Sequence, residues 1–273
     1  MTLIVFDLDG TLLNKQSQLS DFTRDTLRLL RERDIAYTVA TGRTLHAARD
    51  LVTADHFLLP QIYKNGVVTW DPVTENYSHQ FLLSSGETDR ILHAFLAQGL
   101  TPFIFTLDQH GEHAVYHTPL VTELDHRLAQ DIREHRHLPV LPADELPGDA
   151  GITNVSALGE QAAAKAIGVM VEAEDHLVAY MGPGIEDRSM FWLDVHHSDG
   201  SKGAAVARLK KDLGMQTLIC FGDSDNDLSM FDEADECYAP ENGKVEVKAA
   251  ATAVIGDHDD DGVARFLRER FNL

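Results

Sequence analysis

Two aspartates that are two residues apart follow the first apolar segment of this chain. Asp7 and Asp9 come directly after residues 3–6 (Leu-Ile-Val-Phe), and a Gly-Thr pair typical of a turn follows them. The short apolar run predicts a buried strand. Carboxylates at the C-terminal end of such a strand would enter the crevice where open α/β sheets bind ligands. Because neighbouring carboxylates repel each other unless a cation or a shared proton compensates, we expect the pair to do chemistry.

Three further polar clusters occur in the outer parts of the chain. Residues 41–43 (Thr-Gly-Arg) and 223–227 (Asp-Ser-Asp-Asn-Asp) each follow an apolar strand-like run, and Lys202 begins a predicted helix. The carboxyl ends of parallel strands share one edge of a sheet, so these clusters can converge with Asp7 and Asp9. Carboxylates suit Mg²⁺, whereas hydroxyl, ammonium and helix N-terminal donors suit phosphoryl oxygens. The clusters therefore predict a site for Mg²⁺ and phosphate.

The order of the predicted elements favours an α/β fold with an insertion. Strands alternate with helices over residues 1–81 and again over 198–273, which predicts a doubly wound parallel sheet with a Rossmann-like core. In the first part we expect a helix capped by Ser20 or Asp21, a helix over about 44–52 and a third strand near 61–63. Residues 82–197 mix helices with strands and predict an inserted α+β domain.

The composition limits the partners of the protein. Its 273 residues include 44 acidic and 23 basic ones, giving a formal charge of -21. Such a charge repels nucleic acid and anionic membrane surfaces, so we expect neither as a partner. The two cysteines form no disulfide framework, the N-terminus lacks the pattern of a signal peptide, and no apolar run approaches the roughly 20 residues of a membrane span. We therefore expect a cytoplasmic protein.

Four separated motifs make the chain resemble the haloacid dehalogenase superfamily of phosphohydrolases. Additional matches resemble its Cof-type branch, subfamily IIB: Val39 to Arg43 (Val-Ala-Thr-Gly-Arg), Asn65-Gly66, the placement of the insert, and the ending Asp261-Gly262-Val263-Ala264. Agreement of four motifs in order is far more specific than any one of them. The motifs are Asp7-Leu-Asp9-Gly10-Thr11, Thr41-Gly42-Arg43, Lys202-Gly203 and Gly222-Asp223-Ser224-Asp225-Asn226-Asp227.

The resemblance implies a role for each motif. Asp7 would be the nucleophile that forms an aspartyl-phosphate, and Asp9 would act as general acid and then as general base. Mg²⁺ would be held by the Asp7 carboxylate, the Asp9 backbone carbonyl and Asp223. Arg43 either joins the phosphate site or pairs with a surface acid. Asp227 would orient the metal's shell and Lys202. The implied metal-site residues are Asp7, Asp9, Asp223 and Asp227. The implied phosphate-binding residues are Thr41, Gly42, Arg43, Lys202 and Asn226.

The implied activity is Mg²⁺-dependent hydrolysis of a small phosphorylated metabolite, such as a sugar phosphate, with the insert at 82–197 acting as a cap domain. One alternative is a phosphotransferase or phosphosugar mutase that uses the same nucleophile, because an aspartyl-phosphate can pass to an acceptor other than water. A second is a non-enzymatic phospho-accepting module, which would need neither the insert nor Asp9. One departure from the family pattern, Pro240-Glu241, puts an acid near the expected phosphate side.

Overall fold

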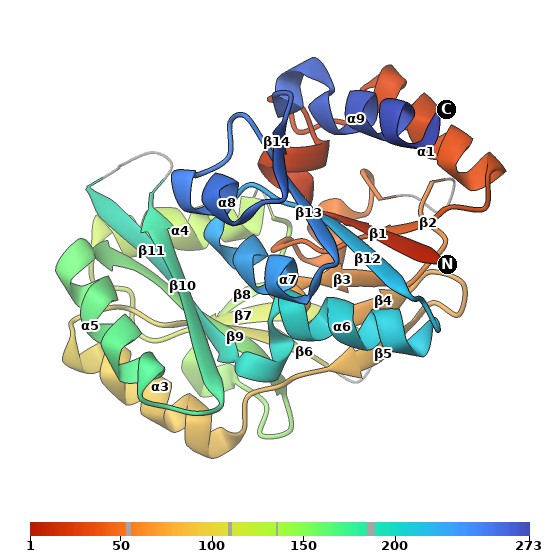
Figure 1. Cartoon of the computed structure of the whole chain (residues 1–273). Helices are drawn as coiled ribbons and strands as arrows, with labels where there is room; N and C mark the ends of the chain where they lie inside the picture. The colour runs from red at the N-terminus through yellow and green to blue at the C-terminus, as the bar shows by residue number, and fades with distance from the viewer. Residues whose placement is uncertain (53–55, 109–110, 135, 185–188) are drawn as a thin grey trace. The chain divides into compact units, whose positions relative to one another are not determined.

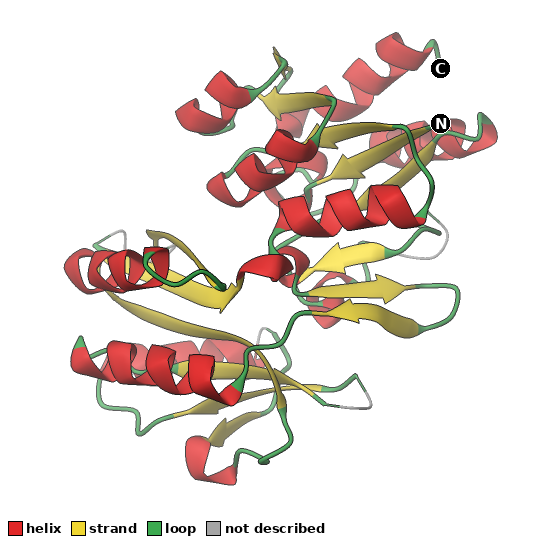
Figure 2. Cartoon of the chain, turned by 60° about the horizontal axis from the view of Figure 1, so that its bottom comes forward, coloured by secondary structure: helices red, strands yellow, loops and turns green. Residues whose placement is uncertain are grey.

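The chain divides into two compact units (Figures 1 and 2). The computed structural model describes residues 1–52, 56–108, 111–134, 136–184 and 189–273. The first unit comprises Met1–Gln80 and Asp199–Leu273, and the second comprises Phe81–Ser198. The second unit is therefore inserted into the sequence of the first. Its assignment as a cap domain stays a prediction.

A five-stranded parallel sheet forms the centre of the first unit, with the strand order β14-β13-β12-β1-β2. All of its neighbouring strands are parallel, which confirms the predicted α/β class. The apolar run that precedes Asp7 is buried throughout its length from Leu3. The strands are β1 (Thr2–Phe6), β2 (Ala36–Val39), β12 (Thr217–Phe221), β13 (Glu236–Pro240) and β14 (Ala253–Ile255).

Helices cover both faces of this sheet (Figure 1). Helices α6, α7 and α8 pack on one face in a core that includes Val206, Met230 and Cys220. On the other face the ring of Phe266, in α9, contacts those of Phe221 and Tyr238. The helices of this unit are α1 (Asp21–Glu32), α2 (Leu45–Ala48), α6 (Lys202–Asp212), α7 (Leu228–Glu233), α8 (Val245–Ala250) and α9 (Gly262–Phe271), with short turns η1 (Leu8–Leu12), η2 (Lys64–Gly66), η5 (Asp225–Asp227) and η6 (His258–Asp260); η4 (Ser198–Gly200) crosses the boundary between the units.

Side-chain caps determine where the first two helices, α1 and α2, begin. Ser20 caps α1, because its hydroxyl accepts a hydrogen bond from the Thr23 N–H at 2.9 Å, and this confirms one of the two expected caps. Thr44 caps α2 in the same way. The helix expected over 44–52 is shorter than predicted, since α2 ends at Ala48.

The third strand differs from the expectation of a regular parallel strand. β3 (Gln61–Tyr63) pairs antiparallel with β4 (Val68–Asp71), which pairs with β5 (Asn76–Gln80) in a separate three-stranded sheet. A single parallel bridge, Ala40 to Ile62, joins β3 to the end of β2. The chain reverses after Tyr63 because all three residues of η2 have positive φ angles. Such angles are uncommon outside glycine and asparagine, so Lys64 gave no signal of the reversal, although Asn65 and Gly66 are compatible with it.

The second unit contains a six-stranded sheet with the order β10-β11-β9-β6-β7-β8, antiparallel except for the β7–β8 pair. α3 and α5 pack on one core cluster of this unit and α4 on another. A capping box between Ser84 and Glu87 begins α3. The elements are α3 (Ser85–Ala97), β6 (Phe103–Leu107), β7 (His113–His117), α4 (Glu123–Glu134), β8 (Val140–Pro142), η3 (Ala143–Glu145), β9 (Gly151–Glu160), α5 (Gln161–Glu172), β10 (Leu177–Pro183) and β11 (Met190–His197).

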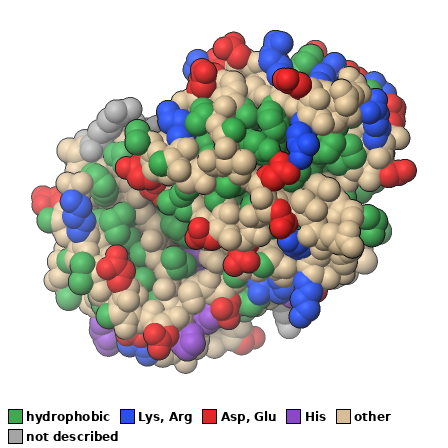
Figure 3. Space-filling model, in the orientation of Figure 1, with side chains coloured by type: hydrophobic (Ala, Val, Ile, Leu, Met, Phe, Trp, Pro, Cys, Tyr) green, Lys and Arg blue, Asp and Glu red, His purple; other side chains and the backbone are tan. Residues whose placement is uncertain are grey.

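Many of the acidic side chains lie among basic ones at the surface. Figure 3 shows Asp and Glu side chains interspersed with Lys and Arg on the face in view. Several form exposed ion pairs, such as Lys244 with Asp225 at 2.6 Å. Such pairs contribute little to stability, about 0–1 kcal/mol each. None of the helices in the described ranges is long and apolar enough to cross a membrane.

Candidate active site

The predicted polar clusters converge at one edge of the parallel sheet. Asp7 follows β1, Thr41 follows β2 and Asp223 follows β12, and these three strands are adjacent and parallel. The Asp7 N–H donates to the Phe221 carbonyl at 2.9 Å, which joins the ends of β1 and β12. Lys202, the first residue of α6, reaches the same place with its side chain. The structure therefore brings these four segments together, as parallel topology requires.

Lys202 bridges two of the predicted carboxylates. Its Nζ lies 2.6 Å from Asp7 Oδ1 and 2.6 Å from Asp227 Oδ1, and the side chains of Lys202 and Asp227 are 0% exposed. Burial disfavours the ammonium, but the two carboxylates outweigh it and raise the pKa of Lys202. Lys202 therefore carries a positive charge in the interior.

Asp7, Asp223 and Asp227 form a compact group of potential metal ligands. One carboxylate oxygen from each lies within 4.8 Å of the others. Burial raises the pKa of Asp7, with the charges of Asp227 and Asp223 adding to the effect and Lys202 opposing it. Burial and Asp227 also raise the pKa of Asp223 to about 6. The group thus holds more negative charge than one ammonium compensates. An all-oxygen donor set with excess negative charge fits Mg²⁺.

The loop that carries Asp223 is held in place by Asp227 and by the turn after Asp7. Asp227 Oδ2 accepts hydrogen bonds from the N–H groups of Asp223 and Ser224, each at 2.9 Å. Thr11 Oγ1 donates to Asp223 Oδ1 at 3.0 Å. Gly10 has a φ of +75°, and a Cβ there would lie 2.6 Å from Asp223 Oδ2. The turn therefore requires glycine for its backbone angle and for its close approach to Asp223.

The Asp9 carboxylate is bound by Arg43. Arg43 Nε donates to Asp9 Oδ2 at 2.7 Å and Arg43 Nη2 donates to Asp9 Oδ1 at 2.6 Å. The Asp9 side chain is 52% exposed. Of the two expected roles for Arg43, the structure shows pairing with an acid, and that acid is the predicted general acid and base. The Asp9 carboxylate is not one of the three grouped above, and the predicted metal contact of Asp9 was through its backbone carbonyl.

Asn65, which was not among the predicted phosphate-binding residues, lies against two of them, Asn226 and Gly42. Thr41 is buried, and its Oγ1 accepts from the Arg43 N–H at 3.1 Å. Asn226 Nδ2 donates to Asn65 Oδ1 at 2.8 Å, and a Cβ on Gly42 would lie 3.1 Å from that same oxygen. The Asn-Gly pair after β3 was the available sequence signal, because asparagine before glycine is typical of left-handed turns.

The segment that departs from the family pattern approaches the turn after Asp7 through Asn242. Asn242 Nδ2 donates to the Gly10 carbonyl at 2.7 Å, and its Oδ1 accepts from the His258 N–H at 3.1 Å. Glu241 is exposed, and its carbonyl accepts from Lys248 Nζ at 2.9 Å. Sequence reasoning missed Asn242 and His258, because both bonds join segments that are distant in the chain.

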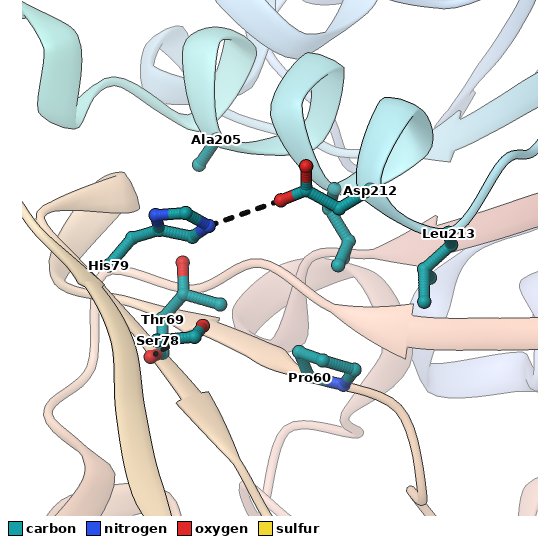
Figure 4. Close-up of a pocket in the computed structure, with 8 residues that line it drawn as sticks. Pro60, Thr69, Ser78, His79, Ala205, Asp212 and Leu213 are labelled. Carbon is teal, nitrogen blue, oxygen red and sulfur yellow. Dashed lines mark hydrogen bonds and ion pairs between the residues drawn. The ribbon is translucent and has the colours of Figure 1, made fainter.

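A separate small pocket of the first unit lies between β4, β5 and α6 (Figure 4). Two of its lining residues, His79 and Asp212, approach to 3.1 Å between Nε2 and Oδ2. The other lining residues are small or apolar, and none is a predicted site residue: Pro60, Thr69, Ser78, Ala205, Leu209 and Leu213.

Comparison with known proteins identifies similar chains over nearly the full length. A family model of haloacid dehalogenase-like hydrolases matches residues 4–267. The pyridoxal phosphate phosphatase YbhA of Escherichia coli (strain K12) is 26% identical, with 97% of each chain covered. The 5-amino-6-(5-phospho-D-ribitylamino)uracil phosphatase YwtE of Bacillus subtilis (strain 168) is 25% identical, with 98% of this chain and 97% of its own covered.

Solved structures show the same fold. A haloacid dehalogenase-like hydrolase from B. subtilis aligns with a TM-score of 0.79 at 24% identity, covering 98% of this chain and 99% of its own. The sugar phosphatase BT4131, of subclass IIB of the same superfamily, aligns with a TM-score of 0.76 at 18% identity, covering 100% of this chain and 99% of its own.

Proposed function

This chain belongs to the haloacid dehalogenase-like hydrolase family, and on that basis we propose that it is a Mg²⁺-dependent phosphatase of a small phosphorylated molecule. The resemblance drawn from the four motifs is confirmed, as is the expectation of an enzyme. The single observation that supports the specific reaction is the buried Lys202, which bridges Asp7 and Asp227 beside Asp223.

The donor set supports a site for Mg²⁺. Asp7, Asp223 and Asp227 supply hard oxygen ligands, and we infer that the backbone carbonyl of Asp9 joins them. When bound, Mg²⁺ would neutralise the carboxylates and polarise a phosphoryl oxygen. Burial is the main cause of the raised pKa values of Asp7 and Asp223, and the neighbouring carboxylates add to it; a bound cation would favour the carboxylate form of both.

Asp7 is the proposed nucleophile. Its Oδ1 accepts from Lys202, whereas its Oδ2 accepts no hydrogen bond from the residues that the structure describes. Oδ2 attacks phosphorus, the bond between phosphorus and the leaving oxygen breaks, and an aspartyl-phosphate forms. The Lys202 ammonium lies beside the acceptor carboxylate, where it favours the negative charge carried by the transferred group.

Asp9 is the proposed general acid and base. Protonated Asp9 gives its proton to the leaving oxygen, and the resulting carboxylate then takes a proton from a water molecule. That water attacks phosphorus while the bond between phosphorus and Asp7 Oδ2 breaks, which releases orthophosphate and restores the Asp7 carboxylate. In the present conformation both of its carboxylate oxygens accept from Arg43, so the side chain must release one of them to reach the leaving group.

The substrate class comes from the relatives. By their names, YbhA acts on pyridoxal phosphate, YwtE on a phosphoribitylamino-uracil, and BT4131 on sugar phosphates. These are small phosphate monoesters, and we propose the same class here, with Phe81–Ser198 as the cap domain that selects among them.

The test is phosphate release from a panel containing pyridoxal phosphate and several sugar phosphates. The wild type with Mg²⁺ should release orthophosphate, EDTA should stop release, and added Mg²⁺ should restore it. Asp7→Asn should abolish turnover, whereas Asp212→Asn, outside the site, should not. Full activity in Asp7→Asn would exclude the mechanism. Transfer of phosphate to an added sugar in preference to water would favour the phosphotransferase alternative.

A further inference from the structure

We propose that Asn65 is a positioning residue that turns the donor end of the Asn226 amide toward the phosphoryl group. The inference rests on the proposed function, which assigns Asn226 to the phosphate site. Asn65 lies in η2, directly after β3, and is only 9% exposed. No motif that carries the predicted chemistry contains it.

Asn65 ties together the loops that follow two strands of the parallel sheet. Its Oδ1 accepts from Asn226 Nδ2 at 2.8 Å, in the loop after β12. Its N–H donates to the Thr41 carbonyl at 2.9 Å, in the loop after β2. Asn65 therefore fixes the distance between the loops of Thr41 and Asn226, and both of these residues are proposed to bind phosphate.

The orientation of the Asn226 amide follows from the chemistry of its partner. A carboxamide has a donor end and an acceptor end, and phosphoryl oxygens are acceptors, so only the Nδ2 end is useful to a phosphate. Asn65 Oδ1 is an acceptor, and it would face another acceptor if the Asn226 amide were reversed. Nδ2 carries two hydrogens, and the second has no partner within the described ranges of the chain. That second hydrogen is the one that we assign to the phosphoryl oxygen.

The backbone of η2 holds Asn65 in this position. Asn65 has a φ of +57°, which asparagine tolerates better than most residues. Gly66 follows with a φ of +110°, and a Cβ there would lie 2.3 Å from the Ser201 carbonyl. Ser201 is the N-cap of α6, so η2 packs directly on the start of the helix that carries Lys202. The turn thus contacts the motifs of Thr41, Asn226 and Lys202.

The absence of a side chain at Gly42 is part of the same arrangement. A Cβ at Gly42 would come within 3.1 Å of Asn65 Oδ1, the atom that binds Asn226. Glycine at this position therefore leaves the oxygen accessible to the amide. Its φ angle is not positive, so the requirement arises from the approach of Asn65 and not from the backbone of Gly42.

The experiment is a double-mutant cycle on phosphate binding. The dissociation constant of orthophosphate is measured by calorimetry, with Mg²⁺ present, for the wild type, Asn65→Gly, Asn226→Ala and the double variant. Glycine at 65 keeps the left-handed backbone and removes only the side chain. The control is Glu75→Gly, at an exposed turn residue with a similar φ of +53°. Phosphate binding is measured separately from turnover, so a wild type that binds phosphate without hydrolysing esters would count against the proposed function alone.

We expect Asn65→Gly to weaken phosphate binding about tenfold, and to have no further effect in the Asn226→Ala background, since residues of one hydrogen-bond network couple. Glu75→Gly should bind as the wild type does. A tenfold loss that persists in the Asn226→Ala background, or no loss in Asn65→Gly, would overturn the inference. If Asn65→Gly does not fold, Asn65→Asp takes its place. Aspartate keeps an acceptor oxygen for Asn226 Nδ2, so Asn226→Ala should still weaken phosphate binding in the Asn65→Asp background. Equal phosphate binding by Asn65→Asp and by Asn65→Asp/Asn226→Ala would overturn the inference.

Discussion

Arg43 binds both carboxylate oxygens of Asp9 through a bidentate pair of hydrogen bonds, at 2.7 and 2.6 Å. Bidentate geometry fixes the plane of the carboxylate as well as its position. The remaining guanidinium nitrogen of Arg43, Nη1, donates to the Ala47 carbonyl at 3.3 Å. Asp9 is therefore held through Arg43 by α2, which follows the Thr41 motif in the sequence. The proposed acid and base is positioned by the same segment that supplies Thr41 to the proposed phosphate site.

Replacement of Arg43 should slow catalysis without removing the phosphate site. In Arg43→Lys the single ammonium cannot form the paired bonds, so Asp9 loses its fixed orientation. We expect kcat to fall about 10- to 100-fold, as misplaced catalytic groups do, with a smaller change in KM. Steady-state kinetics on the best ester of the panel measure both constants. Arg28→Lys, which alters an exposed ion pair on α1, is the matched control. An unchanged kcat in Arg43→Lys would show that the pair does not matter to the reaction.

Removal of the Lys202 ammonium should destabilise the protein. Lys202→Met would leave the carboxylates of Asp7 and Asp227 buried without their cation. Breaking a buried ion pair by removing one partner typically costs about 3–5 kcal/mol. Urea unfolding measured with EDTA should show a loss of this order. Lys210→Met, which breaks a more exposed pair with Asp235, should cost far less. Similar losses in the two variants would contradict the assigned charge balance.

The metal-free protein should become less stable as the pH rises through the range of Asp223. Its folded pKa is about 6, against an ordinary value of 3.8, so the folded state binds more protons than the unfolded state between these limits. Stability therefore falls as the pH rises from about 4 to about 6, by at most about 3 kcal/mol.

Mg²⁺ should reverse this trend, because it binds the carboxylate form. The increase in Tm caused by Mg²⁺ should be small at pH 5 and larger at pH 8, and Asp223→Asn should lose most of the difference. Thermal unfolding at both pH values, with EDTA or Mg²⁺, checks the prediction. An equal Mg²⁺ effect at pH 5 and pH 8 would argue against Asp223 as a ligand.

Gly10 should tolerate no side chain. In Gly10→Ala the new methyl group would meet Asp223 Oδ2, and the φ of +75° would be strained as well. Gly214→Ala is a matched control, because Gly214 has a φ of +63° but no atom within 4 Å of the position that a Cβ would take. Both variants should lose about 1 kcal/mol or more of stability from backbone strain. Only Gly10→Ala should also weaken Mg²⁺ binding, as measured by calorimetry. Equal Mg²⁺ affinity in the two variants would show that Gly10 does not shape the site.

The features that sequence could predict are those encoded locally. Short apolar runs predicted β1 and β12, and Ser20 was one of two expected caps of α1. Parallel topology then placed the polar residues that follow the strands at one edge. Asp7, Lys202 and Asp223 could therefore be grouped from the sequence before any distance between them was known.

The remaining features depend on contacts between distant segments. The reversal after β3 arises from positive φ angles at Lys64 and Asn65, which residue type alone does not specify. The partner of Arg43, the bond between Asn65 and Asn226, and the approach of Asn242 to Gly10 each join residues that are 34 or more positions apart. Side-chain pairs of this kind follow from how the loops pack, and no local pattern predicts them.

The most direct test of the proposed mechanism is to trap the phosphorylated enzyme. A labelled substrate is mixed with Asp9→Asn in the presence of Mg²⁺, the reaction is stopped with acid, and the labelled peptide is identified by mass spectrometry. Asp9 is the proposed acid of the first step and the proposed base of the second, so its replacement should slow both. The substrate is therefore an aryl phosphate, whose phenolate leaves without a proton, so that hydrolysis of the intermediate is the step that is mainly slowed. We predict one phosphoryl group on Asp7 and none in the Asp7→Asn/Asp9→Asn double variant. Label on another residue, or turnover by an enzyme that never carries label on Asp7, would contradict the central claim.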